Sequence, residues 1–179
     1  MKTLTLLRHA KSGWDDGPAR DFDRPLNAKG ARAAEVVGRH LRKLGLAFDH
    51  VVASPAVRVG DTISALAIGY GRALDPHWDT RLYLASPPTL LDVIHGLPAG
   101  ADRVLLIGHN PGLEELVLQL VPEAADDALR TEAAIKYPTA TVAEIRFDGR
   151  WDSVVPATGT LTRFIRPRDL DPTLGPDPA

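Results

Sequence analysis

The chain has 179 residues, of which 44% are hydrophobic and 25% charged, proportions that are ordinary for a soluble globular protein of one domain. Its 21 Lys and Arg residues against 23 Asp and Glu residues give a net charge of -2, which argues against a nucleic-acid-binding protein because such proteins carry a basic excess. There is no cysteine, so disulfide bonds, thiol catalysis and cysteine metal sites are excluded.

The N-terminal segment lacks the cleavage pattern of a secretory signal peptide. No apolar run approaches the ~18 residues that a membrane helix needs. We therefore expect a cytoplasmic protein that has neither a membrane nor a nucleic acid as its partner.

The first part of the chain predicts a buried strand, a long loop and a helix. Residues 2–9 are short, apolar and bounded by polar residues, which is typical of a buried strand. Residues 10–27 are rich in Gly, Pro and Asp and predict a loop whose length is typical of functional segments. Asn27 then predicts the N-cap of a helix over residues 28–44, where apolar residues recur at helical spacing.

The same strand-then-helix order repeats further along. Residues 50–54 predict a second strand, and Ser54-Pro55 predicts an N-cap with proline at the first position of a helix that runs to about Ile68. The later expected strands cover residues 73–77 and 103–108, and the later expected helices cover 88–96, 111–121 and 126–135.

Two alternating segments, 140–147 and 152–165, predict an antiparallel pair joined by a turn at Asp148-Gly149. Together these elements predict an α/β three-layer sandwich, with a mostly parallel central sheet flanked by helices, over residues 1–166. Residues 167–179 are rich in Pro and Asp and predict a flexible tail.

Arginine and histidine side chains stand at the ends of three predicted strands. Arg8 and His9 close the first strand, Arg58 follows the second, and His109 follows the strand 103–108. Because the carboxyl ends of parallel strands form the ligand crevice of such sheets, we expect these four side chains to meet at one edge. Two arginines and two histidines suit the binding of a phosphoryl group.

Arg58 and His9 also have plainer interpretations. A cation in the first turn of a helix opposes the helix dipole by ~0.3–1 kcal/mol, which is explained if the helix end and Arg58 bind one anion together. Arg58 could instead be an exposed residue paired with Asp61, and His9 could be only a hydrogen-bond donor at a strand end. We assign no role to the remaining histidines, which are His40, His50, His77 and His95.

Three segments, LTLLRHAKSG, ASPAVRVGDT and LLIGHNPGLEEL, together resemble the histidine phosphatase superfamily (branch 1, phosphoglycerate mutase-like) over about residues 2–165. The short length, the RPLNAKG segment at 24–30 and the GHNP sequence most resemble its phosphohistidine phosphatase (SixA) group. The resemblance implies that His9 attacks phosphorus and forms a phosphohistidine intermediate, which water then hydrolyses. It implies that Arg8, Arg58 and His109 hold the phosphoryl oxygens, so that no metal and no cofactor are required.

The general acid is the point where the chain departs from that family. Many members carry a glutamate in the stretch that corresponds to residues 79–84, where this chain has Tyr83. Asp21 and Asp23 are the remaining candidates, although they could equally only pair with Arg20 or Arg24. Arg24 is in addition a lesser candidate for binding phosphate.

A weak general acid favours phosphoramidates over phosphate esters, because the imidazole of a phosphohistidine leaves readily once protonated. The leading hypothesis is therefore a metal-independent phosphatase that acts on a phosphohistidine protein. The alternatives are a phosphomonoesterase for a sugar or nucleotide phosphate, a binding module for phosphate that has lost catalysis, and, with no evidence in its favour, a mutase.

Overall fold

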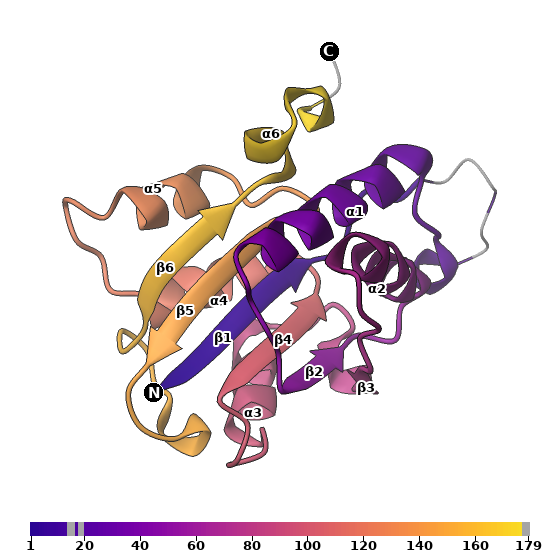
Figure 1. The fold of residues 1–179 in the computed structure, drawn as a ribbon. Helices are drawn as coiled ribbons and strands as arrows, with labels where there is room; N and C mark the ends of the chain where they lie inside the picture. Colours follow the sequence, from indigo (N-terminus) through magenta and orange to yellow (C-terminus); the bar gives the residue numbers. More distant parts are fainter. Residues whose placement is uncertain (14–16, 18–19, 177–179) are drawn as a thin grey trace.

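A six-stranded sheet of order β3-β2-β4-β1-β5-β6 forms the centre of the computed structural model, which describes residues 1–13, 17 and 20–176 (Figure 1). The strands are β1 (Lys2–Arg8), β2 (His50–Ala53), β3 (His77–Trp78), β4 (Arg103–Gly108), β5 (Val142–Phe147) and β6 (Thr160–Ile165). The four strands β1 to β4 pair in parallel, and β5 runs antiparallel to both of its neighbours. The predicted mostly parallel sheet is confirmed.

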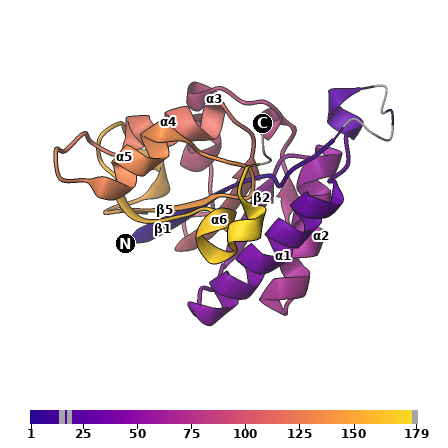
Figure 2. The same ribbon diagram turned by 90° about the horizontal axis from the view of Figure 1, so that it is seen from above.

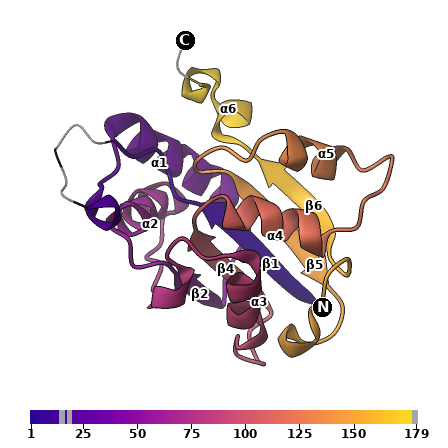
Figure 3. The same ribbon diagram turned by 180° about the vertical axis from the view of Figure 1, so that it is seen from behind.

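Helices cover both faces of this sheet, so the predicted three-layer sandwich is confirmed (Figures 2 and 3). One face carries α1 (Ala28–Lys43), α2 (Val57–Tyr70) and the short α6 (Pro167–Leu170). The other face carries α3 (Pro87–His95), α4 (Gly112–Leu120) and α5 (Ala128–Ile135). No helix in the described part of the chain is long and apolar enough to cross a membrane.

The central strands are mostly apolar because both faces of the sheet are buried, and successive side chains point to alternate faces. Leu4 and Leu6 of β1 belong to the core under α3 and α4, whereas Leu7 belongs to the core under α1 and α2. In β4, Leu106 and Ile107 divide between the two cores in the same way. A strand that is buried on both faces has no polar face, as the sequence indicated.

The predicted tight turn between the last two strands is wrong. β6 begins at Thr160 instead of residue 152, and the connection over residues 148–159 contains a 3₁₀ helix, Trp151–Ser153. Trp151 is buried there, and its indole N–H donates a 2.7 Å hydrogen bond to the carbonyl oxygen of Ala101. The alternating apolar residues of this segment therefore anchor a connection to the core and do not form a strand.

The predicted flexible tail is also wrong for residues 167–176, while residues 177–179 lie outside the described part of the chain. Residues 167–174 form α6 and a 3₁₀ helix, Pro172–Leu174, which pack beside α1. Leu174 is buried in the core under α1, and Lys29 Nζ donates a 2.7 Å hydrogen bond to the carbonyl oxygen of Gly175. These long-range contacts overcome a composition that by itself favours disorder.

Candidate active site

The sheet order brings the two predicted histidines side by side. β1 and β4 are parallel neighbours, and Arg8 lies opposite Gly108, so His9 and His109 leave adjacent strands at the same level. Their ring centroids are 5.3 Å apart. β2 lies on the other side of β4, which places Ser54 next to His109.

The backbone carbonyl of the next residue, Ala10, orients the His9 ring. The ring Nδ1 lies 2.7 Å from the carbonyl oxygen of Ala10, and a carbonyl can only accept, so Nδ1 carries the proton and Nε2 keeps a free lone pair. The N–H of Ala10 in turn donates to the Thr62 hydroxyl at 2.9 Å, and that hydroxyl donates to the carbonyl oxygen of Arg58. The end of β1 is thereby tied to the first turns of α2.

Burial, together with the positive charges of Arg58 and Arg8, lowers the pKa of His9 to about 4. The ring is therefore neutral at pH 7. A neutral imidazole whose Nε2 lone pair is free is the protonation state that a nucleophile requires.

His109 lies between a hydroxyl and a guanidinium. Its Nε2 is 2.7 Å from Ser54 Oγ, and its Nδ1 is 3.3 Å from Arg58 Nη2. Because a guanidinium can only donate, Nδ1 accepts from Arg58 and Nε2 donates to Ser54. Burial, followed by the nearby His9 and Arg58, lowers the pKa of His109 to about 3.

The prediction that Ser54 caps α2 is wrong. The helix begins at Val57, its N-cap is Ala56, and no side chain caps it. The hydroxyl of Ser54 is directed instead at His109, and Ser54 is fully buried. The sequence SP before a helix is typical of a cap. The contact of Ser54 with His109 is a tertiary contact, which this local pattern does not predict.

Arg58 lies in the first turn of α2, as predicted, and is buried. Its guanidinium donates to both the backbone carbonyl and the carboxylate of Asp21, at 2.8 and 3.0 Å. The alternative pairing with Asp61 is wrong, because Asp61 instead accepts the N–H of Leu26 at 3.1 Å.

Arg8 is held by the backbone of the segment that follows α5. Its Nη1 donates a 2.9 Å hydrogen bond to the carbonyl oxygen of Tyr137, which also accepts from the side-chain amide of Asn110. Within the described residues the buried Nε of Arg8 has no hydrogen-bond partner. Arg8 thus brings an incompletely bonded guanidinium to the end of β1.

The structure separates the two candidate acids. Asp21 accepts hydrogen bonds from the Tyr83 hydroxyl at 2.6 Å, from Arg58 at 3.0 Å and from Arg24 at 3.1 Å. The Tyr83 hydrogen bond is the largest cause that lowers the pKa of Asp21 to about 2, and the two arginines add to it. Asp21 is therefore ionised at neutral pH.

Asp23 does not face this site. Its carboxylate pairs with the exposed Arg20 at 2.8 Å, which is the plain interpretation that the sequence left open. Arg24 forms an ion pair with Asp21 at 3.1 Å, and its positive charge is one of those that lower the pKa of His9.

Sequence reasoning missed three contributors to the site. Ser54 was interpreted as a cap, Tyr83 only as a missing glutamate, and Tyr137 was not considered at all. The Tyr83 ring contacts His109 edge-on, with centroids 5.4 Å apart. Arg8 and Tyr137 are 129 residues apart in the chain, so no local pattern could have joined them.

Among the residues that the structure describes, no group of three or more His, Asp or Glu side chains is placed to hold a metal ion.

Comparison with known proteins agrees with this geometry. Residues 4–83 match the model of the histidine phosphatase superfamily (branch 1). An uncharacterized protein of Mycobacterium tuberculosis, Rv1276c, is 34% identical over 163 residues, which cover 90% of this chain and 100% of that protein.

Two solved structures are similar over nearly their whole length. A candidate phosphohistidine phosphatase SixA from Nakamurella multipartitia has a TM-score of 0.80 and 30% identity, covering 93% of this chain and 96% of that one. A candidate SixA from Agrobacterium tumefaciens has a TM-score of 0.76 and 26% identity, covering 92% and 97%.

Proposed function

Because this chain belongs to the histidine phosphatase superfamily (branch 1) and is therefore a phosphatase, we propose that its substrate is a phosphohistidine in a protein. The observation that carries this proposal is the protonation state of two groups: His9, at the end of β1, and Asp21, the carboxylate that is bonded to Arg58. His9 is neutral with a free Nε2, and the nearby acid, Asp21, has a pKa of about 2.

In the first step, Nε2 of His9 attacks phosphorus in line with the bond to the substrate imidazole. The new N–P bond forms as the old one breaks, and the electron pair returns to the leaving ring, which departs as neutral imidazole once it carries a proton. Arg8 and Arg58 hold the phosphoryl oxygens as charge spreads over them, and His109 orients the Arg58 guanidinium by accepting a hydrogen bond from it. Nδ1 of His9 keeps its proton and donates it in a hydrogen bond to the carbonyl oxygen of Ala10, which fixes the ring during attack.

In the second step, water attacks the phosphorus of the His9 intermediate. The P–O bond forms as the N–P bond breaks, inorganic phosphate leaves, and Nε2 recovers its lone pair after the proton released by water passes to solvent. Since Arg8 and Arg58 supply the positive charge that holds the oxygens, we propose that neither step requires a metal or other cofactor.

The state of Asp21 bears on the substrate. An alkoxide leaving group needs a strong proton donor, and a carboxylate with a pKa of about 2 is almost never protonated at neutral pH. The imidazole of a phosphohistidine has a pKa near 6.5 when free and can acquire its proton from water. This difference supports a phosphoramidate substrate over a phosphate ester.

The deciding experiment compares the hydrolysis of a phosphohistidine protein with that of an alkyl phosphate ester, glycerol 2-phosphate, whose alkoxide leaving group needs a proton, both in EDTA, for the wild type and His9→Ala. We expect fast loss of phosphohistidine with the wild type only, and an unchanged far-UV circular dichroism spectrum for His9→Ala. A preference for the ester would favour a small-molecule phosphomonoesterase. Hydrolysis that persists in His9→Ala would remove His9 from the mechanism, and turnover of neither compound would favour a binding module.

A further inference from the structure

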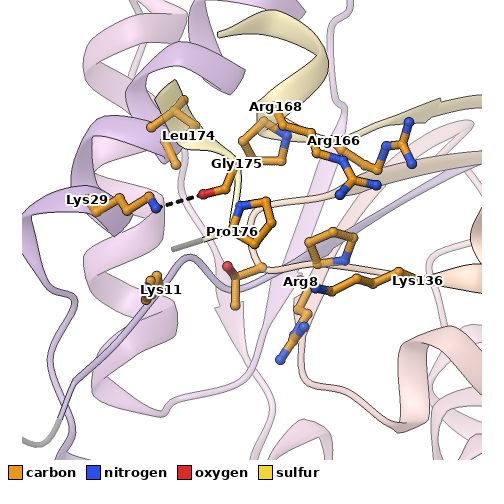
Figure 4. A pocket seen from close by; sticks show the side chains of 13 residues that line it. Arg8, Lys11, Lys29, Lys136, Arg166, Arg168, Leu174, Gly175 and Pro176 are labelled. Atoms are coloured by element: carbon orange, nitrogen blue, oxygen red, sulfur yellow. Dashed lines mark hydrogen bonds between the residues drawn. The ribbon is translucent and has the colours of Figure 1, made fainter. Parts of the chain in front are cut away.

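A pocket lined by basic side chains, which we term the cationic pocket, lies beside the candidate active site (Figure 4). It lies between the end of β1, the start of α1, residues 136–139 and residues 166–176, and has a volume of about 320 Å³. Its basic residues are Arg8, Lys11, Lys29, Lys136, Arg166 and Arg168. Arg8 belongs to both this pocket and the candidate active site, so the two adjoin.

The charge of the cationic pocket is not balanced by its own walls. No Asp or Glu occurs among the described residues that line it. Arg166 is neutralised by Asp169 at 3.0 Å, but in the described part of the chain the side chains of Lys136 and Arg168 form no hydrogen bond or ion pair. In a protein with a net charge of -2, this is a local excess of positive charge that an anion would relieve.

The remaining walls are apolar, which indicates more than a site for a bare ion. Ala33, Leu174 and the proline rings of Pro138, Pro167 and Pro176 face the pocket between the cations. Its volume falls at the lower end of the ~300–1,000 Å³ typical of pockets for small organic ligands. Such walls suit an organic group that carries its negative charge at one end.

Resting on the proposed function, we propose that the cationic pocket binds a second anionic group of the substrate, a carboxylate or a phosphate, while the phosphoryl group to be removed lies against His9. Arg8 lies at the junction, where it can contact the transferred group on one side while Lys136 and Arg168 contact the second group. The preferred substrate therefore carries at least two separated anionic groups. The second group belongs either to a small molecule or to an acidic side chain beside a phosphohistidine.

The test measures binding without turnover, in a His9→Ala background. Calorimetry compares phenyl phosphate with phenyl phosphates that carry a carboxylate at the meta or para position. We expect at least one carboxylated compound to bind about tenfold more tightly than phenyl phosphate. Adding Lys136→Gln and Arg168→Gln should abolish that preference while leaving the affinity for phenyl phosphate unchanged.

A matched control removes the same charge elsewhere. Lys43 and Arg146 are both exposed and are not among the residues lining the cationic pocket, so Lys43→Gln with Arg146→Gln should retain the full preference. Equal affinity for the plain and carboxylated compounds, or a preference that survives the Lys136 and Arg168 substitutions, would overturn the proposal. Because no hydrolysis is measured, either result is independent of whether the enzyme cleaves phosphohistidine.

A kinetic arm with active enzyme distinguishes the source of the second group. Two phosphohistidine peptides, with and without a glutamate near the phosphorylated residue, are compared for the wild type and the Lys136, Arg168 double variant. A lower KM for the acidic peptide that the double variant loses, with kcat unchanged, identifies an acidic protein substrate. A preference confined to the carboxylated phenyl phosphates identifies a small molecule.

Discussion

At the scale of single residues, the site depends on hydrogen-bond partners that orient its two histidines and keep Asp21 ionised. His9 and His109 are both neutral imidazoles, yet each is fixed by a different partner: a backbone carbonyl for His9, and Ser54 with Arg58 for His109. Tyr83 and two arginines hold Asp21 in its ionised form. The side-chain partners, unlike the backbone carbonyl of Ala10, can be replaced one at a time without changing the proposed nucleophile.

Ser54→Ala tests the support of His109. Removing the hydroxyl leaves the buried Nε2–H without an acceptor and frees the ring, so we expect kcat to fall about tenfold, the equivalent of ~1.4 kcal/mol, with KM little changed. Ser64→Ala is the control, because Ser64 is exposed and bonds only a carbonyl of its own helix. Equal kcat in wild type and Ser54→Ala would mean that this hydrogen bond does not position His109.

Tyr83→Phe tests the cause of the low pKa of Asp21. It deletes the 2.6 Å hydrogen bond, the largest of the groups that lower this pKa, so the pKa of Asp21 should rise from about 2. NMR titration of the side-chain carboxyl carbons measures the change. Asp79 is an internal reference, since Arg81 lowers its pKa, and an Asp21 curve that stays in place would assign the effect to the arginines alone.

At the scale of elements, α1 and α2 approach each other through two glycines. A Cβ built on Gly38 would lie 2.2 Å from the carbonyl oxygen of Leu66, and one built on Gly69 would lie 1.9 Å from that of Glu35. Both distances are far below van der Waals contact, so only glycine permits this approach. Because α2 also carries Arg58, the position of the helix bears on the site.

Gly69→Ala should therefore destabilise the protein by ~1–3 kcal/mol, because the helices must separate to admit a methyl group. Gly60→Ala is the control in the same helix: its Cβ would meet only the Trp78 ring, at 3.8 Å, so the substitution should be neutral or stabilise by up to ~1 kcal/mol. Urea unfolding measures both. Similar unfolding midpoints for the two variants would refute the close approach.

At the scale of the whole molecule, the features that could be predicted are those that depend on residues close together in the sequence. Buried strands, helix periodicity and the polar residues at strand ends placed His9, His109, Arg8 and Arg58 at one edge of a parallel sheet. The roles of Ser54, Tyr137 and the C-terminal segment depend on residues far away in the chain. For Ser54 the cap pattern, and for the C-terminal segment the composition, even indicated the opposite. Tertiary contacts decided those three cases.

The stability of the whole molecule should depend on pH through the two buried histidines. A histidine in the unfolded chain has a pKa near 6.5, whereas burial lowers it to about 4 for His9 and about 3 for His109. The unfolded state thus binds more protons below pH 6.5, so this contribution is complete above pH 6.5 and is lost as the pH falls. We expect the free energy of unfolding to drop by ~2 kcal/mol per histidine between pH 7 and pH 5.

Urea titrations at both pH values, with His9→Gln for comparison, check this dependence. The drop should be ~2 kcal/mol smaller for the variant than for the wild type, because one of the two groups no longer titrates. A variant that loses as much stability as the wild type would show that His9 is not held neutral.

The pairing of β1 has a consequence for how the protein is made. Its two neighbours are β4 and β5, which follow it in the chain, so β1 stays unpaired until residues 103–108 have emerged and gains its second neighbour when residues 142–147 have emerged. At the ~5–20 residues per second of translation, the roughly 100 residues between β1 and the end of β4 take about 5–20 seconds to emerge. Throughout this time the apolar strand that carries His9 has no sheet to join, so truncated or slowly translated chains should be the forms that require chaperones.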